Sequence, residues 1–172
     1  GYGPNPNECV ALLNEYDHLC VAGNHDWAAL EKLDIQDFNP DARQAVLWTQ
    51  RELTETSREY LAQLPTRLES EDFTIVHGSP REPIWEYVLL PSLAATNFHW
   101  FNTRYCFVGH THSPAIYQEL TDNVSTSARS LPVKRDEPLQ LGDSRLIINP
   151  GSVGQPRDGD ARASYVILDL EE

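Results

Sequence analysis

The sequence contains no methionine, few cysteines and no apolar run that approaches the length of a membrane span. The three cysteines, Cys9, Cys20 and Cys106, form an odd and scattered set, which argues against a disulfide framework. Cys20 and Cys106 lie inside apolar runs, where a buried free thiol is the expected state. No basic segment followed by an apolar one marks a signal peptide. These absences favour a reducing, cytoplasmic setting and no membrane partner.

Basic residues are scarce as well: 13 Lys and Arg face 26 Asp and Glu, which gives a formal net charge of −13. Such a surface repels a polyanion, and Lys134-Arg135 is too short for a nucleic-acid patch. A nucleic-acid partner is therefore disfavoured, while the oligomeric state stays open. With 40% hydrophobic residues in a chain of 172, and no repeat or linker, residues 1–172 are expected to form a single domain.

Three short apolar segments each lead into a motif of glycine and histidine. Residues 19–22 precede Gly23-Asn24-His25-Asp26, residues 73–76 precede His77-Gly78, and residues 104–108 precede Gly109-His110-Thr111-His112. Aromatic and β-branched side chains predict that the apolar segments are strands. In an extended segment residues i and i+2 point to the same side, so His110 and His112 can face one metal ion. Three such strand ends suggest one site at the carboxyl edge of a sheet.

Each motif taken alone has a simpler interpretation. The Asn24 amide oxygen can ligate a hard metal and His25 can donate a proton to a leaving group, but His25 and Asp26 can equally be an ordinary surface pair. A single histidine at a strand end, such as His77, is more often structural. The occurrence of all three motifs in this order, each after an apolar segment, favours a shared metal site.

In this order the motifs resemble the last three signature blocks of the calcineurin-like metallophosphoesterases. Residues 149–157, Asn-Pro-Gly-Ser-Val-Gly-Gln-Pro-Arg, are similar to a segment of the small bacterial and archaeal phosphodiesterase branch, and the similarity runs from Gly1 to about Asp169. The resemblance implies an α/β fold, a four-layer αββα sandwich of two mixed β-sheets flanked by helices. It also implies two divalent transition metal ions, and mixed nitrogen and oxygen ligands suit Mn, Fe, Co, Ni or Zn.

The resemblance also implies roles for individual residues. Four residues correspond to metal ligands: Asn24, His77 and His110 for one ion, and His112 for the other. His25 corresponds to the group that protonates the leaving oxygen or steadies the transition state, and Asp26 would orient it. Two further candidates come from the arginine side chain itself, because Arg81 and Arg157 can hold phosphate oxygens by bidentate contact. Surface arginines paired with the many acids are an equal alternative for both.

The sequence departs from the family pattern at its start. The Asp-x-His and Gly-Asp blocks, which in the family precede the Gly-Asn-His-Asp motif and supply the rest of the first metal's shell and the bridging carboxylate, do not occur ahead of Gly23. Without a methionine, and opening on Gly1-Tyr2-Gly3-Pro4, the chain is expected to be a piece of a longer or processed polypeptide, truncated just after these blocks. Two strands would be missing with them, and residues 1–172 alone are expected to be catalytically silent toward phosphodiesters.

The first part of the chain is expected to contain helices and strands, and the part after His112 mainly strands. This order suggests two packed sheets flanked by helices. Helices are expected from Asn5-Pro6, over about 27–33, over about 41–53, from a capping box at 56–59, and over 92–101. After His112, strands are expected over 115–120, around 133, and over 139–141, 145–148 and 164–170, with a hairpin loop at 122–130.

We therefore predict a metal-dependent phosphoesterase that hydrolyses phosphodiester or phosphomonoester bonds of a small substrate with a water activated by two metals. One alternative is a non-catalytic scaffold of the same fold that binds protein partners, against which the retained His25 argues. Another is a dinucleoside-polyphosphate or protein phosphatase, which shares the chemistry and differs in substrate.

Overall fold

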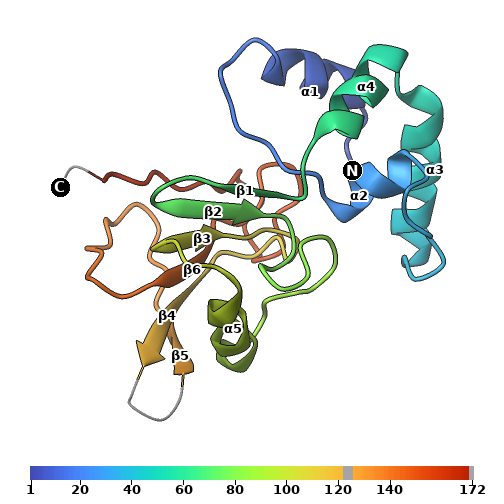
Figure 1. The fold of residues 1–172 in the computed structure, drawn as a ribbon. Coiled ribbons are helices and arrows are strands. Elements are labelled where there is room, and N and C mark those ends of the chain that lie inside the picture. The colour runs from blue at the N-terminus through green and yellow to red at the C-terminus, as the bar shows by residue number, and fades with distance from the viewer. Residues whose placement is uncertain (122–125, 171–172) are drawn as a thin grey trace.

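The computed structural model describes residues 1–121 and 126–170. Four helices gather beyond one end of a six-stranded sheet: α1 (Pro6–Leu13), α2 (Asn24–Ala29), α3 (Pro40–Glu52) and α4 (Glu55–Gln63). A fifth helix, α5 (Pro91–Asn97), continues into the 3₁₀ helix η1 (Phe98–Trp100) and lies beside the sheet (Figure 1). No helix within these ranges is both long and apolar enough to cross a bilayer.

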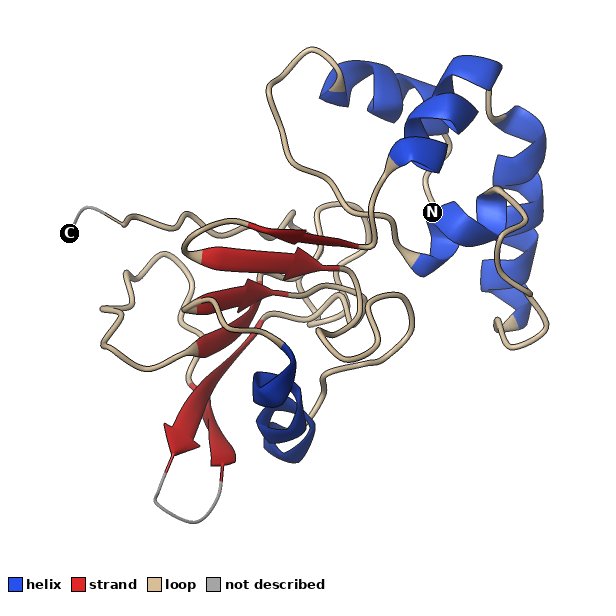
Figure 2. Ribbon diagram, viewed as in Figure 1, coloured by secondary structure: helices blue, strands red, loops and turns tan. Residues whose placement is uncertain are grey.

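The sheet is mixed, with the strand order β1-β2-β3-β6-β4-β5. Its members are β1 (Arg67–Glu69), β2 (Phe73–Val76), β3 (Tyr105–Phe107), β4 (Ala115–Thr121), β5 (Thr126–Leu131) and β6 (Leu146–Asn149). The strands β2, β3 and β6 pair in parallel at its centre, and the outer pairs are antiparallel. Figure 2 shows the three parallel strands pointing toward the helical group, so their carboxyl ends face it.

The helix starts follow from capping chemistry. Asn39 caps α3, because its side-chain oxygen accepts from the Ala42 N–H at 2.9 Å and Pro40 begins the helix. The start of α4 differs from the prediction: Thr54 is the N-cap, two residues before the expected capping box. The helix α2 also begins earlier than predicted, at Asn24, because the Asp26 carboxylate accepts the Gly23 N–H at 2.8 Å.

Several predicted strands differ in the structure. Among the described residues one sheet forms where two were expected, and segments 19–22 and 164–170 are not in its ladder. Residues around 133 and over 139–141 are also irregular, and β1 was not predicted. The predicted loop 122–130 falls partly outside the described residues, and from Thr126 it is strand. A strand needs a neighbour for its backbone groups, and segment 19–22 lies beside the connection between α4 and β1, where Ala22 N–H donates to Pro65 O at 2.8 Å.

The sheet is buried on both faces, which explains the apolar run of its central strand. All four residues of β6 are buried. One face packs against α5 and η1 through Ala94, Phe98, Val76, Cys106 and Ile147, and the other carries Tyr105, Leu146 and Ile148. A separate core inside the helical group contains Ala28, Phe38, Ala42 and Val46. The three glycine–histidine motifs therefore lie between the core of the sheet and the core of the helical group.

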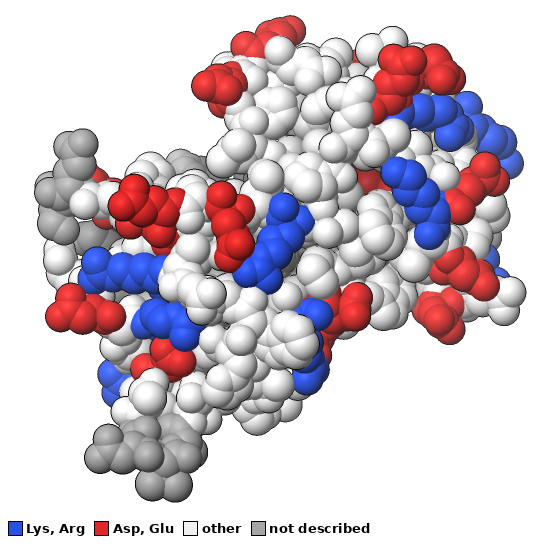
Figure 3. All heavy atoms as spheres, viewed as in Figure 1, with Lys and Arg blue, Asp and Glu red and all other residues white. Residues whose placement is uncertain are grey.

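The excess of acidic residues does not gather into one patch on the face seen in Figure 3. Red and blue side chains alternate over the sheet and the helical group there. This distribution fits a solvated surface with ion pairs of the kind seen between Arg67 and Glu69, at 2.6 Å. Such exposed pairs contribute little to stability, about 0–1 kcal/mol each.

The burial of β6 predicts a large cost for truncating its centre. Ile147 is 0% exposed, whereas Ile167 is 82% exposed and offers a matched control. We expect Ile147→Ala to lower the free energy of unfolding by about 2–5 kcal/mol, from lost transfer energy and the cavity left behind. Ile167→Ala should change it by less than about 0.5 kcal/mol. Urea unfolding measures both, and equal losses would contradict this description of the core.

Candidate metal centre

Parallel pairing brings two of the motifs together. The strands β2 and β3 are in register, with Ile75 opposite Phe107, so the residues after each strand leave at the same edge of the sheet. The Gly109 N–H continues the ladder by donating to His77 O at 2.8 Å. His77 and His110 therefore lie next to each other, although 33 residues separate them in the chain. The third motif reaches this edge through the first turn of α2.

Two side chains converge on the His77 ring. Its Nε2 atom lies 2.9 Å from Asn24 Oδ1 and 3.0 Å from His110 Nδ1. The ring fits a cradle at Gly23, because a Cβ added there would lie only 2.8 Å from His77 Nδ1. Glycine is therefore required at position 23 by close approach, not by a turn. The structure thus brings Asn24, His77 and His110 to one point.

The turn that carries His110 and His112 is not extended, which corrects the prediction from spacing. Both residues have left-handed backbone conformations, with φ of 62° and 61°. The His110 ring stacks on Tyr87 with ring centroids 3.8 Å apart, and its Nε2 atom is buried without a hydrogen-bond partner. The stacking of Tyr87 fixes the plane of a candidate ligand, and no motif in the sequence indicated it.

His112 is held by a backbone carbonyl. Its Nδ1 atom lies 2.8 Å from Gln155 O, and because a carbonyl only accepts, Nδ1 carries the proton. The neutral ring then keeps the Nε2 lone pair available for a metal. The Arg157 N–H in turn donates to His112 O at 3.0 Å. Residues 155–157 therefore hold both the ring and the backbone of His112, a contact that spacing in the sequence cannot reveal.

His25 lies against aromatic rings at the first turn of α2. Its ring centroid is 4.6 Å from that of Tyr2 and 5.2 Å from that of Phe38, and its Nδ1 atom is buried without a partner. The predicted orienting residue, Asp26, instead directs its carboxylate to the Gly23 N–H. Asp26 therefore caps the helix that presents His25 and acts on that ring only through the helix.

One cavity of about 710 Å³ joins these groups. Its lining includes all four candidate ligands together with His25, Asp26 and Arg157. Arg157 donates to Gln155 Oε1 at 3.0 Å at this rim. Arg81 is not among the described lining residues, since it forms an ion pair with Glu86. The structure thus places Arg157 at the cavity and gives Arg81 the surface pairing weighed as its alternative.

Burial keeps the site histidines neutral. Desolvation, with the neighbouring histidines, lowers the pKa of His77 to about 3 and the pKa values of His25 and His110 to about 4. Desolvation also lowers the pKa of His112, and burial raises that of Asp26. At neutral pH the imidazoles are therefore unprotonated, which is the state that a metal ligand requires.

The donor set fits part of a metal shell. Two ligand atoms about 2.1 Å from one ion and at right angles to each other lie about 3.0 Å apart, which matches the spacings at His77 Nε2. Within residues 1–121 and 126–170, however, no group of three His, Cys, Asp or Glu side chains could hold an ion by themselves. The centre as described consists of two imidazoles and one amide oxygen, with His112 farther along the same cavity.

A model of the calcineurin-like phosphoesterase superfamily domain matches residues 3–172. The chain belongs to this family. An uncharacterized protein of Methanocaldococcus jannaschii is 37% identical over 177 residues, which cover 100% of this chain and 68% of that protein. Membership confirms the resemblance seen in the three glycine–histidine motifs.

Solved structures agree on the calcineurin-like fold. A metallophosphoesterase from Sphaerobacter thermophilus matches with a TM-score of 0.81 and 45% identity, covering 99% of this chain and 69% of that one. A hypothetical protein from Pyrococcus horikoshii matches with a TM-score of 0.67 at 19% identity, covering 98% of this chain and 66% of that one, and supports the fold alone. The expected α/β fold class is thereby confirmed.

The depressed histidine pKa values predict that acid destabilises the metal-free chain. Below about pH 6.5 the unfolded histidines bind protons that the folded ones, with pKa values of about 3 to 4, do not. The contribution of these histidines to the free energy of unfolding should therefore be fully present above about pH 6.5. It should fall as the pH decreases toward 4. At pH 5, His77 alone accounts for about 2 kcal/mol. Urea unfolding measures the free energy of unfolding at pH 7 and at pH 5. The decrease between the two pH values should be smaller for His77→Asn than for the exposed control His99→Asn.

The cradle at Gly23 predicts a selective loss of metal binding. We expect Gly23→Ala to displace the His77 ring and to weaken Mn²⁺ binding by at least about tenfold, because supporting contacts of ligands carry this much affinity. Gly109→Ala is the control, since a Cβ there would make an ordinary contact of 3.5 Å with His77 O. Isothermal titration calorimetry measures both dissociation constants. Equal affinities in the two variants would contradict the role of the cradle.

Proposed function

We propose that the protein is a metal-dependent phosphoesterase that cleaves phosphodiester or phosphomonoester bonds of a small substrate with a water activated by two divalent metals. The observation that carries this proposal is the meeting of Asn24, His77 and His110 within 2.9–3.0 Å at the carboxyl edge of parallel strands. Its support comes from membership of the calcineurin-like phosphoesterase family and from the metallophosphoesterase of Sphaerobacter thermophilus. Because the chain spans about two thirds of these relatives, with 68% and 69% covered, activity is a property to test on the full-length protein.

In this proposal Asn24, His77 and His110 hold one ion and His112 belongs to the other. When bound, such ions orient the phosphate oxygens, lower the pKa of a water and offset the charge that develops during in-line attack. Nitrogen and oxygen donors together suit Mn, Fe, Co, Ni or Zn. The neutral state of the buried imidazoles supports this assignment, since no proton has to leave them before a metal binds.

His25 is proposed to protonate the leaving oxygen. Its ring lines the cavity and touches Tyr2 and Phe38, which shield it from water. Desolvation holds the pKa of His25 at about 4 in the chain alone. An anionic phosphate in the cavity would favour the imidazolium, and the two metal cations of the proposed site would oppose it. In this proposal the ring takes a proton from solvent and then donates it to the leaving oxygen.

Arg157 is proposed to hold phosphate oxygens with its guanidinium group. It lines the cavity and is anchored at its backbone to His112 O. The same role for Arg81 stays a prediction that its position does not support, because its ion pair with Glu86 would have to open first. A cytoplasmic location also belongs to the proposal, and the three free cysteines agree with a reducing compartment.

Substitutions should separate the two kinds of residue in the full-length protein. We expect His25→Ala to lower turnover of a chromogenic phosphodiester by about 10²–10⁴-fold while metal content stays near that of the wild type. His110→Ala should lose metal and turnover together, and the exposed His99→Ala should lose neither. Steady-state kinetics with elemental analysis measures both properties.

Two results would overturn these roles. If His25→Ala loses metal as readily as His110→Ala, His25 is a ligand and not the proton donor. If the full-length wild-type protein binds no divalent metal and hydrolyses no phosphate ester, the proposed function itself is wrong, and the scaffold alternative takes its place.

A further inference from the structure

We propose that Asn149 and Thr111 form a positioning pair that holds the turn of His110 and His112 in its ligand-presenting conformation. This inference rests on the proposed function, since it concerns how the same site is kept in shape. Neither residue is a ligand or touches substrate in the proposed mechanism. The pair acts through the two histidines that flank Thr111.

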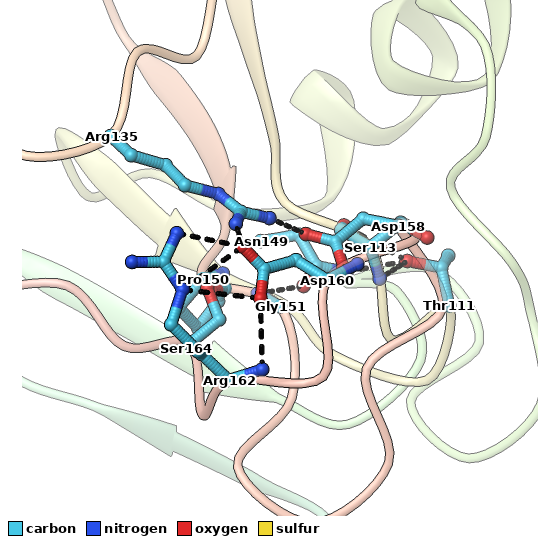
Figure 4. Close-up of polar contacts among 10 residues, drawn as sticks. All are labelled: Thr111, Ser113, Arg135, Asn149, Pro150, Gly151, Asp158, Asp160, Arg162 and Ser164. Carbon is cyan, nitrogen blue, oxygen red and sulfur yellow. Dashed lines mark hydrogen bonds and ion pairs between the residues drawn. The ribbon is translucent and has the colours of Figure 1, made fainter.

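Every polar group of the Asn149 side chain is engaged. Asn149 ends β6 and is 2% exposed. Its Nδ2 donates to Gly109 O at 2.7 Å and to Thr111 Oγ1 at 2.9 Å, and its Oδ1 accepts the Gly151 N–H at 2.9 Å. One amide thereby joins the end of the strand β6 to both sides of His110, as Figure 4 shows for the contacts with Thr111 and Gly151.

The turn needs such a contact because two of its residues, His110 and His112, have a backbone conformation that is unfavourable for residues other than glycine. His110 and His112 both have φ near +60°, a region that residues with a Cβ rarely occupy. Such conformations persist only where surrounding contacts over-determine them. Thr111 is buried, and its hydroxyl also accepts the Ser113 N–H at 3.2 Å. The hydroxyl therefore receives hydrogen bonds from the strand β6 and from the residue that follows His112.

The acceptor side of Asn149 is itself fixed by the segment that follows it. Gly151 has φ of +93°, and a Cβ there would lie 2.8 Å from Ser164 Cβ. The Ser164 hydroxyl donates to Pro150 O at 2.6 Å (Figure 4). Gly151 packs closely against Ser164, and its N–H donates to Asn149 Oδ1, which leaves Nδ2 directed toward the turn.

Asn149→Asp tests the pair with the smallest change of shape. It replaces the Nδ2 donor by an acceptor that faces Gly109 O, so this contact becomes repulsive, and Thr111 keeps its bond only if its hydroxyl turns to donate to the new oxygen. Thr111→Val removes the hydroxyl at similar volume, and Thr111→Ser keeps it and should restore the wild-type behaviour. Asn97→Asp is the matched control: Asn97 is 0% exposed and its Nδ2 donates to Glu86 Oε2 and Leu93 O, outside the turn.

Two measurements on the full chain decide the proposal. In metal-free protein, hydrogen exchange followed by mass spectrometry should show faster exchange of residues 109–113 in Asn149→Asp and Thr111→Val, with β2 unchanged. In calorimetry with Mn²⁺ alone, both variants should bind about 10–100-fold more weakly than the wild type, the range typical of residues that support ligands. Thr111→Ser and Asn97→Asp should bind as the wild type does.

The outcomes separate this inference from the proposed function. Unchanged exchange at 109–113 in both variants would overturn the positioning role whether or not metal binds. An equal loss of affinity in Asn97→Asp would reduce the role of Asn149 to general stability and also overturn it. If Asn149→Asp does not fold, the comparison of Thr111→Val with Thr111→Ser decides between the two outcomes. A wild type without Mn²⁺ binding refutes the metal site, and exchange in the metal-free chain still tests the turn.

Discussion

The parallel pairing of β2 with β3 is the constraint on which the site depends. It sets the two strands in register, and the Gly109 N–H to His77 O bond extends the ladder by one residue past the strand ends. Two histidines from distant parts of the chain then leave the sheet side by side. The pairing is secure because both faces of the sheet are buried, under α5 and η1 on one side and around Leu146 and Ile148 on the other.

Different segments at the carboxyl edge of the sheet position the two histidines and hold their rings. The sheet supplies position, and the turn after β3 supplies direction by placing His110 and His112 in left-handed conformations. Each ring is then fixed by a neighbour of its own: His110 by the Tyr87 face and His112 by the Gln155 carbonyl. The two candidate ligands are presented by backbone geometry and held by contacts from remote segments. This division explains how a rigid site can be built on loops.

The chemistry of the cavity follows from the same burial. Desolvation keeps the imidazoles neutral and available to a metal. The arginine at the rim, Arg157, reaches the cavity because the segment that bonds His112 also carries it. A structural contact and a candidate binding contact therefore belong to one short stretch of chain.

The sequence by itself determined the family, the α/β class and those cavity-lining residues that belong to the three glycine–histidine motifs, because apolar segments ending in Gly and His are local patterns. It also determined β2 at its observed bounds and the helix at Asn39-Pro40, where capping chemistry is local. Only the tertiary structure decided that residues 19–22 stay out of the ladder, that Asp26 caps a helix and that Arg81 pairs with Glu86. Residues 19–22 stay out because Ala22 bonds to the distant Pro65 carbonyl, whereas Asp26 and Arg81 each have a competing partner three to five residues away, and only the folded chain decides which partner is used.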